Sequence, residues 1–262
     1  MKAVLSLDRR QAGYNWDVLR TLVGRELGIR YKGSALGLLW TVLSPLGTVA
    51  VMHLVFTSVL PLNIEHYASY VYSGLLPFTW FQSAVLTSAT TLFDNRDLVR
   101  RPFFPRLLLP AVVTATQFAL YILAMPVLIA LLAFEGVGLT PTLLLLPLVW
   151  AVLAVFALAC SVLVAALGVL MRDVQHILGV GMMLWFYLTP IFYQLDGIAD
   201  SRVALLRYNP MALIISAHRR IALDGRAPDW GELGLCLGVG LALLGVAVVL
   251  FRTLEDIFVE EV

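Results

Sequence analysis

Charge is scarce in this sequence. Of its 262 residues, 13% are charged and 60% are hydrophobic, and the mean hydropathy is +0.89. Soluble domains carry about 25% charged residues and about half apolar residues, so this composition is that of an integral membrane protein. The formal net charge of +1 offers no basic surface for nucleic acid, and we expect no nucleic-acid partner.

The long apolar runs also lack ionisable side chains. Asp, Glu, Lys and Arg are absent from six such runs, in which His53 and Gln117 are the strongest polar exceptions. Proton pumps and ion-coupled transporters usually carry ionisable groups at membrane depth, so both classes are disfavoured. A lone His53 is more often a hydrogen-bonded packing residue than a proton relay.

Motifs for nucleotides, metals and catalysis are missing too. The two lysines, Lys2 and Lys32, lie outside any G-x-x-x-x-G-K-[ST] motif, so ATP would have to be bound by another chain. No H-E-x-x-H, G-x-S-x-G or Cys/His cluster occurs, and Cys160 and Cys236 lie in apolar runs. The only acidic pair in a connection stands among arginines, as surface charges do. We expect no catalytic residue, metal or cofactor in this chain.

The six apolar runs come close to, or exceed, the length of a membrane span. A helix needs about 20 apolar residues to cross a bilayer core of about 30 Å. The sequence therefore predicts an all-α integral membrane protein, with a cytoplasmic segment at 1–32 and a six-helix transmembrane domain at 33–262. The spans are expected at residues 35–60, 67–93, 107–134, 142–170, 177–193 and 233–251. The fifth is the shortest and contains Pro190, which predicts a helix that ends early.

Basic residues give the orientation. The segment up to Lys32 holds seven of the 18 basic residues and the 94–106 connection holds four, whereas the connections 61–66 and 135–141 hold none. Basic residues favour the cytoplasmic side, so both termini and the 94–106 connection are expected there. Five arginines in residues 194–232 are an exception, because the same count places that segment outside.

Residues 15–31 are predicted to form an amphipathic helix on the membrane surface. Apolar side chains recur there at helical spacing from Trp16 to Leu27, and Asn15 is a plausible N-cap. A simple membrane anchor is the alternative. The helix leads into the first span through Gly33 and Gly37, which would permit close packing at the bend.

Four strings in register give the chain a family resemblance. They are RYKGSALGLLWTVLSPL (30–46), MRDV (171–174), TPIFY (189–193) and NPMALIISAHRRIAL (209–223). With them the chain resembles, over nearly its whole length, the permease subunits of bacterial type-2 ABC exporters for surface polysaccharides such as O-antigen, teichoic acid or capsule. The resemblance implies a homodimer in the bacterial inner membrane that moves a lipid-linked polysaccharide outward and contacts membrane lipids.

The resemblance also implies a cytoplasmic ABC ATPase subunit in two copies, which binds ATP and Mg²⁺. In such exporters the N-terminal interface helix and the connection between spans two and three contact the ATPase. The matching residues here are Arg25, Glu26, Arg30, Lys32, Asp94, Arg96, Asp97, Arg100, Arg101, Phe103 and Phe104. The two phenylalanines either dock in a groove of the ATPase, which we favour, or dip into the membrane.

Spans one and five line the path in exporters of this family. The aromatic residues of these spans are Trp40, Phe56, Trp185, Phe186, Tyr187, Phe192 and Tyr193. Aromatic faces stack on sugar rings without demanding one hydrogen-bond pattern, which suits a sliding chain. The alternative is that these residues form an interfacial belt or core, since Trp and Tyr concentrate at membrane boundaries.

The 194–232 segment is expected to form short re-entrant helices on the outer face. Asn209 and Pro210 provide an N-cap and a first helical position, and Asp224-Gly225 provides a stop. Arg219 and Arg220 would then lie near outer-leaflet headgroups or the emerging polymer. A drug or lipid exporter is the runner-up function; a non-transport scaffold and a membrane enzyme follow.

Overall fold

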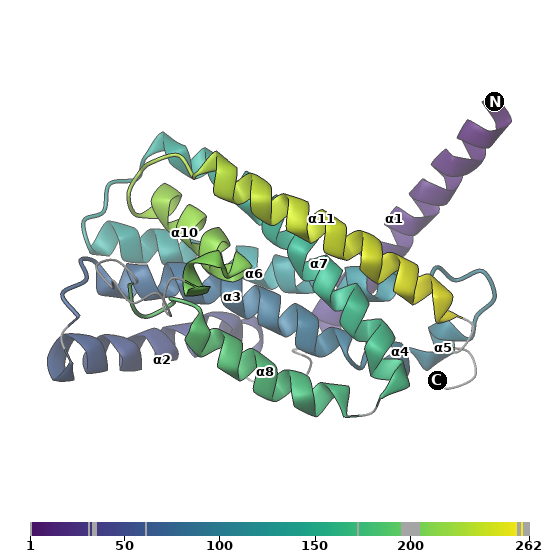
Figure 1. The fold of residues 1–262 in the computed structure, drawn as a ribbon, viewed down its shortest axis with the longest axis horizontal. Coiled ribbons are helices and arrows are strands. Elements are labelled where there is room, and N and C mark those ends of the chain that lie inside the picture. Colours follow the sequence, from purple (N-terminus) through teal and green to yellow (C-terminus); the bar gives the residue numbers. More distant parts are fainter. Residues whose placement is uncertain are drawn as a thin grey trace.

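The structure, a computed structural model, is built of helices packed side by side (Figure 1). It describes residues 2–30, 32, 36–60, 62–171, 173–194, 205–255 and 258, and these contain no β-strand. The longer helices are α1 (Lys2–Arg30), α2 (Trp40–Leu54), α3 (Tyr67–Ser88), α6 (Leu108–Phe134), α7 (Leu146–Leu170), α8 (Val174–Leu188), α10 (Pro210–Ala222) and α11 (Trp230–Thr253). The short ones are η1 (Gly37–Leu39), η2 (Val55–Val59), α4 (Thr91–Asp94), α5 (Arg96–Val99), η3 (Pro141–Leu145) and η4 (Leu205–Tyr208).

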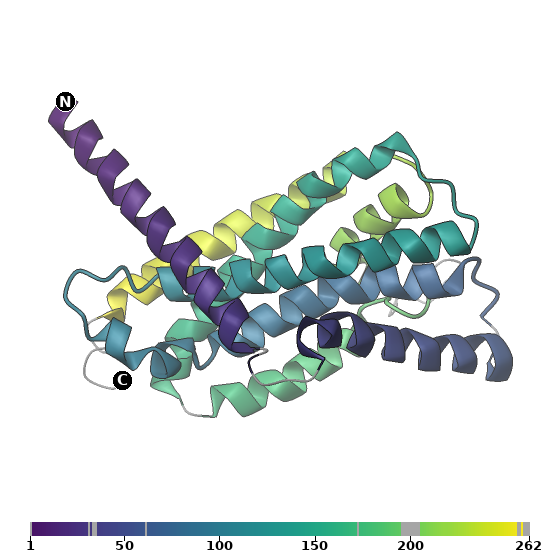
Figure 2. The same ribbon diagram turned by 180° about the vertical axis from the view of Figure 1, so that it is seen from behind.

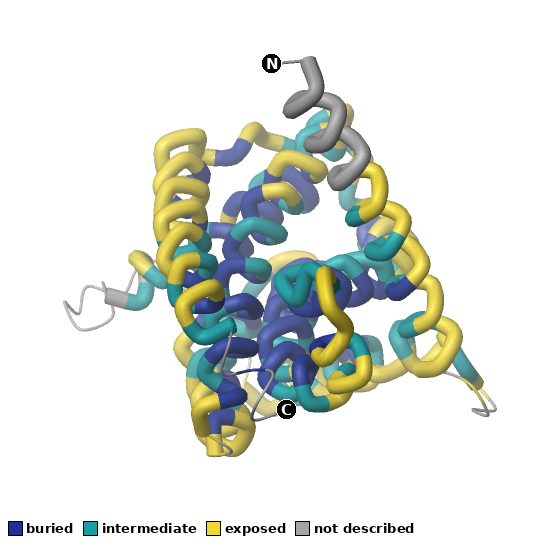
Figure 3. Tube along the Cα trace, turned by 90° about the vertical axis from the view of Figure 1, so that its right-hand side faces the viewer, coloured by how far each residue is buried: buried dark blue, intermediate teal, exposed yellow. Residues whose placement is uncertain are grey.

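Helices α3 and α7 form the interior of the bundle. α3 packs against α6 and α7, and α7 packs against α11. Buried residues run along both helices, while the outer helices turn exposed faces outward (Figure 3). Gly168 permits the close approach of α7 to the end of α3, since a Cβ there would lie 2.2 Å from the Ala89 carbonyl oxygen. A contact this close requires glycine.

Four helical segments among the described residues are long and apolar enough to span a membrane. They are Gly37–Val59, Leu108–Phe134, Pro141–Leu170 and Trp230–Thr253. The predicted span 67–93 is instead α3, which ends at Ser88 and is followed by the separate short helix α4. The predicted span 177–193 is α8, which begins at Val174 and ends at Leu188, before Pro190. The early end of this helix is therefore confirmed.

The N-terminal helix is longer than predicted. α1 runs without a break from Lys2, so Asn15 lies inside it and the prediction of an N-cap there is wrong. The apolar face is confirmed in part, because Leu22 is buried in a cluster with the half-buried Val18, Leu19 and Val23. Trp16 lies off this face and is 64% exposed. α1 crosses α6 and its first half projects beyond the bundle (Figure 2).

Two predicted backbone signals have the expected geometry. The Asn209 side chain accepts a hydrogen bond from the Met211 amide at the start of α10, which confirms the N-cap. Gly225 follows α10 with φ +61°, in the left-handed region that favours glycine, which fits the predicted stop. Gly37 also has a positive φ, +49°, but no atom of the described residues lies within 4 Å of an added Cβ there, so the close packing predicted at Gly37 is not observed. Gly33 and residues 195–204 of the predicted re-entrant segment lie outside the described residues.

Candidate coupling surface and translocation path

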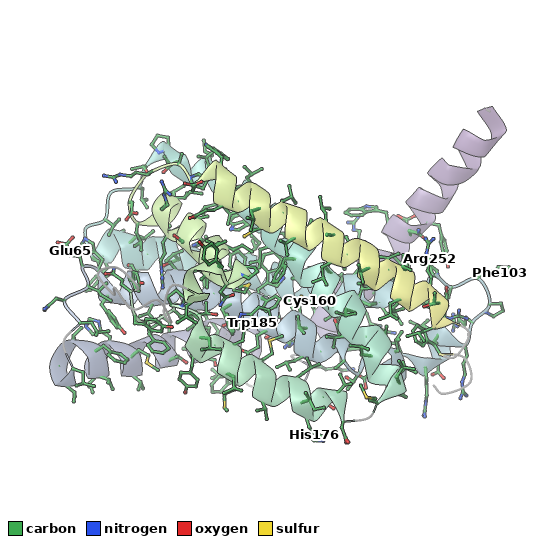
Figure 4. The ribbon with its side chains drawn as sticks, in the orientation of Figure 1. Glu65, Phe103, Cys160, His176, Trp185 and Arg252 are labelled. Atoms are coloured by element: carbon green, nitrogen blue, oxygen red, sulfur yellow. The ribbon has the colours of Figure 1, made fainter. Side chains whose placement is uncertain are left out.

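The predicted site residues divide between two ends of the bundle. Phe103 and Arg252 lie at one end and Glu65 lies at the opposite end (Figure 4). We call the first the coupling end, because it carries the 94–106 connection and the nearby part of α1. We call the second the distal end; it carries the 62–66 and 135–140 connections. The separation follows from helix lengths, since α3 and α6 run antiparallel between the two.

At the coupling end, α1 and the 94–106 connection lie side by side. An Arg25 Nη donates a hydrogen bond to the Asn95 Oδ1 at 2.9 Å. A groove of about 570 Å³ separates the two segments, and Asp17, Thr21, Leu98, Arg101 and Phe103 are among the residues that line it. Arg101 is the predicted coupling charge that lines this groove, and the other charged residues of the connection are exposed outside it: Asp94, Arg96, Asp97 and Arg100. The structure thus brings together two segments that are about 70 residues apart in the chain.

Phe103 and Phe104 have different surroundings. The Phe103 side chain is 98% exposed, and its backbone is in the left-handed region, with φ +63°. The Phe104 side chain packs on the apolar cluster around Leu22 and Leu109. A strained backbone beneath an exposed aromatic side chain is typical of a functional surface. Phe103 is therefore the residue of the pair that is available to a partner.

Arg30 lies apart from the other predicted coupling residues, and Trp40 lies apart from the other predicted path aromatics. Both line a cavity of about 270 Å³ between α2, α3 and α6, together with Ser44 and Gln117. Lys32 is exposed in the turn that follows α1. The structure therefore does not bring Arg30 to the groove beside Phe103, and it does not place Trp40 with the other path aromatics.

Five of the predicted path aromatics form one connected cluster where α2 and α8 end. Phe192 is stacked on Phe56 with ring centroids 5.8 Å apart, and it lies 6.0 Å from Phe186 and 6.1 Å from Tyr187. Tyr193 lies 5.1 Å from Phe192, and its hydroxyl donates to the Tyr187 carbonyl. Phe56 belongs to η2, a π-helical turn, and such turns occur frequently at functional sites.

Trp185 has the contacts of a core residue. Its ring lies 5.1 Å from Phe81 and 6.4 Å from Phe156, both on interior helices. Its indole Nε1 donates a hydrogen bond to Asn209 Oδ1 at 2.9 Å. The side chain thus ties α8 to the start of α10 inside this bundle, and these contacts favour the packing alternative for Trp185.

The two predicted outer-face arginines differ in environment. Arg219 is buried, and its guanidinium donates to the backbone carbonyls of Tyr70, Pro190 and Ile191. Its donors point into the protein, which favours a structural role for Arg219. Arg220 is partly exposed and lies 3.8 Å from the Asp229 carboxylate. Both arginines line a pocket of about 950 Å³ at the distal end, and their contact with headgroups or polymer stays a prediction.

Two structural carboxylates were not anticipated from the sequence. The Glu135 carboxylate accepts hydrogen bonds from the Ala68 and Ser69 amides, and so caps the first turn of α3. The Arg106 guanidinium donates to Glu255 at 2.9 Å and to the Val99 carbonyl, which fastens the 94–106 connection to the C-terminal region. The contacts of Glu135 with the α3 amides and of Arg106 with Glu255 join residues more than 60 positions apart, so local sequence signals do not report them.

Comparison with known proteins identifies the family. The family model described as ABC-2 type transporter matches residues 17–223. The chain is 35% identical over 247 residues to the O-antigen export system permease protein RfbA of Myxococcus xanthus, covering 94% of this chain and 95% of the relative. It is 28% identical over 251 residues to RfbA of Klebsiella pneumoniae (95% and 96% covered), and 24% identical over 241 residues to the polysialic acid transport protein KpsM of Escherichia coli (88% and 91% covered). With most of its length matched by the family model and by these relatives, the chain is a member of the ABC-2 type transporter family.

Proposed function

We propose that this chain is the transmembrane subunit of an ATP-driven exporter that moves a lipid-linked surface polysaccharide across the bacterial inner membrane. The observation that carries the proposal is the near-full-length match to permeases named for O-antigen export and polysialic acid transport. The aromatic cluster around Phe192 supports a sugar polymer as the substrate, because stacked rings present broad apolar faces to sugar C–H groups.

Two copies of the chain would enclose the path between them. Helices α2 and α8 carry exposed apolar stripes, which include Leu43, Val51 and Leu54 on the first and Ile177, Val180 and Leu184 on the second. Apolar faces of this kind suit either lipid or a second copy, and the aromatic cluster between the ends of α2 and α8 favours the second copy here. Trp185 would act by holding α8 in place.

The coupling end would bind a cytoplasmic ATPase, one copy for each permease, with ATP and Mg²⁺ on the ATPase. The exposed charged residues of α4 and α5 and the projecting ring of Phe103 suit a protein partner, since aromatic and arginine side chains dominate binding at interfaces. This assignment puts both termini and the coupling end in the cytoplasm. It counts α3 and α8 as membrane crossings, six in all, and puts α10 in a re-entrant segment on the outer face.

A deletion and complementation experiment tests the proposal. Removing this chain should leave polymer inside the cell and none at the surface, and the wild-type chain should restore surface polymer only together with an intact partner ATPase. A catalytically dead ATPase is the matched control. Surface polysaccharide that is unchanged after deletion would contradict the function, and restoration without ATP hydrolysis would contradict the energy source.

A further inference from the structure

The turn that follows α8 has an unusual set of hydrogen bonds. Four consecutive backbone carbonyls, those of residues 190–193, each accept a hydrogen bond from a side chain of another helix. Arg219 donates to Pro190 at 2.7 Å and to Ile191. The hydroxyls of Tyr67 and Tyr70 donate to Phe192 at 3.1 Å and to Tyr193 at 2.8 Å. We call these three donors, Tyr67, Tyr70 and Arg219, the carbonyl clamp.

Irregular backbone inside an apolar bundle needs such donors. In a helix the carbonyls would be satisfied by amides of the same segment, but α8 has ended and Pro190 contributes no amide hydrogen. A buried carbonyl without a partner costs free energy comparable to a lost hydrogen bond. The conformation of the turn therefore depends on side chains from α3 and α10.

The charge of Arg219 favours one position of the 190–193 turn, the position in which its carbonyls accept hydrogen bonds from the guanidinium. No carboxylate lies within 4 Å of Arg219 among the described residues; the guanidinium is surrounded by three carbonyls and by the Tyr70 ring, with Cζ 3.6 Å from the ring centroid. A buried cation is tolerated only where hydrogen bonds compensate its lost hydration. If the turn moved away, two of these acceptors would leave with it.

Gly74 provides the space that Arg219 occupies. A Cβ at position 74 would lie 2.6 Å from an Arg219 Nη. The clamp is thus built from two helices at once, with donors and free volume from α3 and a cation from α10. The contact pattern distinguishes Arg219 from Arg220, which is partly exposed and lies 3.8 Å from the Asp229 carboxylate.

We propose that the carbonyl clamp is a positioning device for export: it fixes the 189–193 turn so that the aromatic rings of Phe192 and Tyr193 stand beside Phe56 on η2. Arg219 is the central positioning residue. The inference rests on the proposed function, because it assigns the clamp to the same aromatic cluster that would contact the polymer. Its structural half, the dependence of the turn on Arg219, stands apart from any substrate.

The test compares Arg219→Gln with Arg220→Gln in the full-length protein assembled with its ATPase. Spin labels on the exposed positions Leu60 and Gln194 report the distance between the end of η2 and the turn, and surface polymer reports export. Arg219→Gln should broaden the distance distribution and reduce export at least about tenfold, since several charge-assisted hydrogen bonds are lost. Arg220→Gln, which removes no donor to the turn, should leave the distance distribution as in the wild type.

Two further variants keep the test decisive if Arg219→Gln does not accumulate. The double variant Tyr67→Phe, Tyr70→Phe removes two hydroxyls and retains both rings, so it should broaden the distribution and lower export without altering the apolar packing. Gly74→Ala should do the same by displacing the guanidinium, whereas Gly238→Ala on α11, where no atom lies within 4 Å of the added Cβ, should have no effect.

Either measurement can overturn the inference. Normal export with a broadened distribution would show that the position of the turn is irrelevant to export. Lost export with an unchanged distribution would show that Arg219 acts in another way. If the wild-type chain fails to restore surface polymer, the proposed function fails, and the distance measurement still decides whether the clamp fixes the turn.

Discussion

The two ends of the bundle handle their polar groups in opposite ways. At the coupling end, the charged side chains of α4 and α5 and the ring of Phe103 point outward. At the distal end, the carbonyls of the 190–193 turn and the guanidinium of Arg219 point inward and satisfy one another. Exposed charged and aromatic side chains suit the recognition of a partner. A turn whose backbone carbonyls accept hydrogen bonds from within the protein suits a fixed conformation. Substitutions at the two ends should therefore separate binding from folding.

Trp185→Ala should have the largest effect on stability. The ring packs between Phe81 and Phe156 and donates a hydrogen bond to Asn209, so its loss leaves a cavity and removes one of the two hydrogen bonds that Asn209 Oδ1 accepts. Loss of a fully buried aromatic side chain costs about 3–5 kcal/mol, and for the partly buried Trp185 we expect about 3 kcal/mol. Unfolding in detergent or nanodiscs measures the change, with Tyr187→Ala, a 57% exposed neighbour, as the control. Equal unfolding temperatures for the two variants would show that Trp185 contributes no more to stability than the exposed Tyr187.

Phe103→Ala should weaken ATPase binding and leave the permease fold intact. A central aromatic residue of an interface contributes about 2 kcal/mol or more, which corresponds to about 30-fold in Kd. Binding of the purified ATPase to permease in nanodiscs measures the effect. Phe134→Ala is the matched control, because that side chain is 90% exposed at the distal end. Identical binding by both variants would contradict the assignment of the coupling end.

Glu135→Gln should destabilise the distal end by about 1 kcal/mol, the usual magnitude for a carboxylate at a helix N-terminus. The substitution keeps the shape of the side chain and removes the charge that faces the Ala68 and Ser69 amides. Chemical unfolding measures it, and Glu65→Gln, on the exposed 62–66 connection, is the comparison. Equal losses from both variants would indicate a general charge effect and no specific cap.

The Arg106–Glu255 pair should give the smallest effect. Its side chains are 17% and 35% exposed, and partly exposed ion pairs contribute about 0.5–1 kcal/mol. A double-mutant cycle of Arg106→Ala and Glu255→Ala, read by unfolding, isolates the coupling energy from the separate bond of Arg106 to the Val99 carbonyl. A coupling energy near zero would show that the Glu255 contact contributes nothing measurable to the attachment of the 94–106 connection to the C-terminal region.

Local sequence signals predicted much of this architecture. Apolar runs predicted the long helices, Pro190 predicted the end of α8, and Asn209 with Pro210 predicted the start of α10. These signals act over a few residues, so they can be interpreted without knowledge of the tertiary structure. Asn15 shows the limit of such signals: its side chain suits a cap, yet α1 passes through it because thirteen preceding residues are also helical.

Side-chain direction was the part that sequence could not determine. Arg219 and Arg220 are adjacent and chemically identical, and helical spacing turns one toward the carbonyls of the 190–193 turn and the other toward Asp229. The side chains of Phe103 and Phe104 also point in different directions, because the backbone at Phe103 adopts a positive φ that no sequence pattern predicted. Which member of each pair faces inward depends on neighbours far away in the chain.

The continuous length of α1 has a mechanical consequence. Its packed face lies between Val18 and Val23, and the helix extends to Lys2 beyond the bundle (Figure 2). At about 1.5 Å per residue, the free arm from Val18 to Lys2 is roughly 24 Å long. A tilt of about 10° about the packed face would carry its tip through roughly 4 Å. A small rotation of α1 beside α6 would therefore displace the N-terminal end of the helix by about the diameter of a side chain.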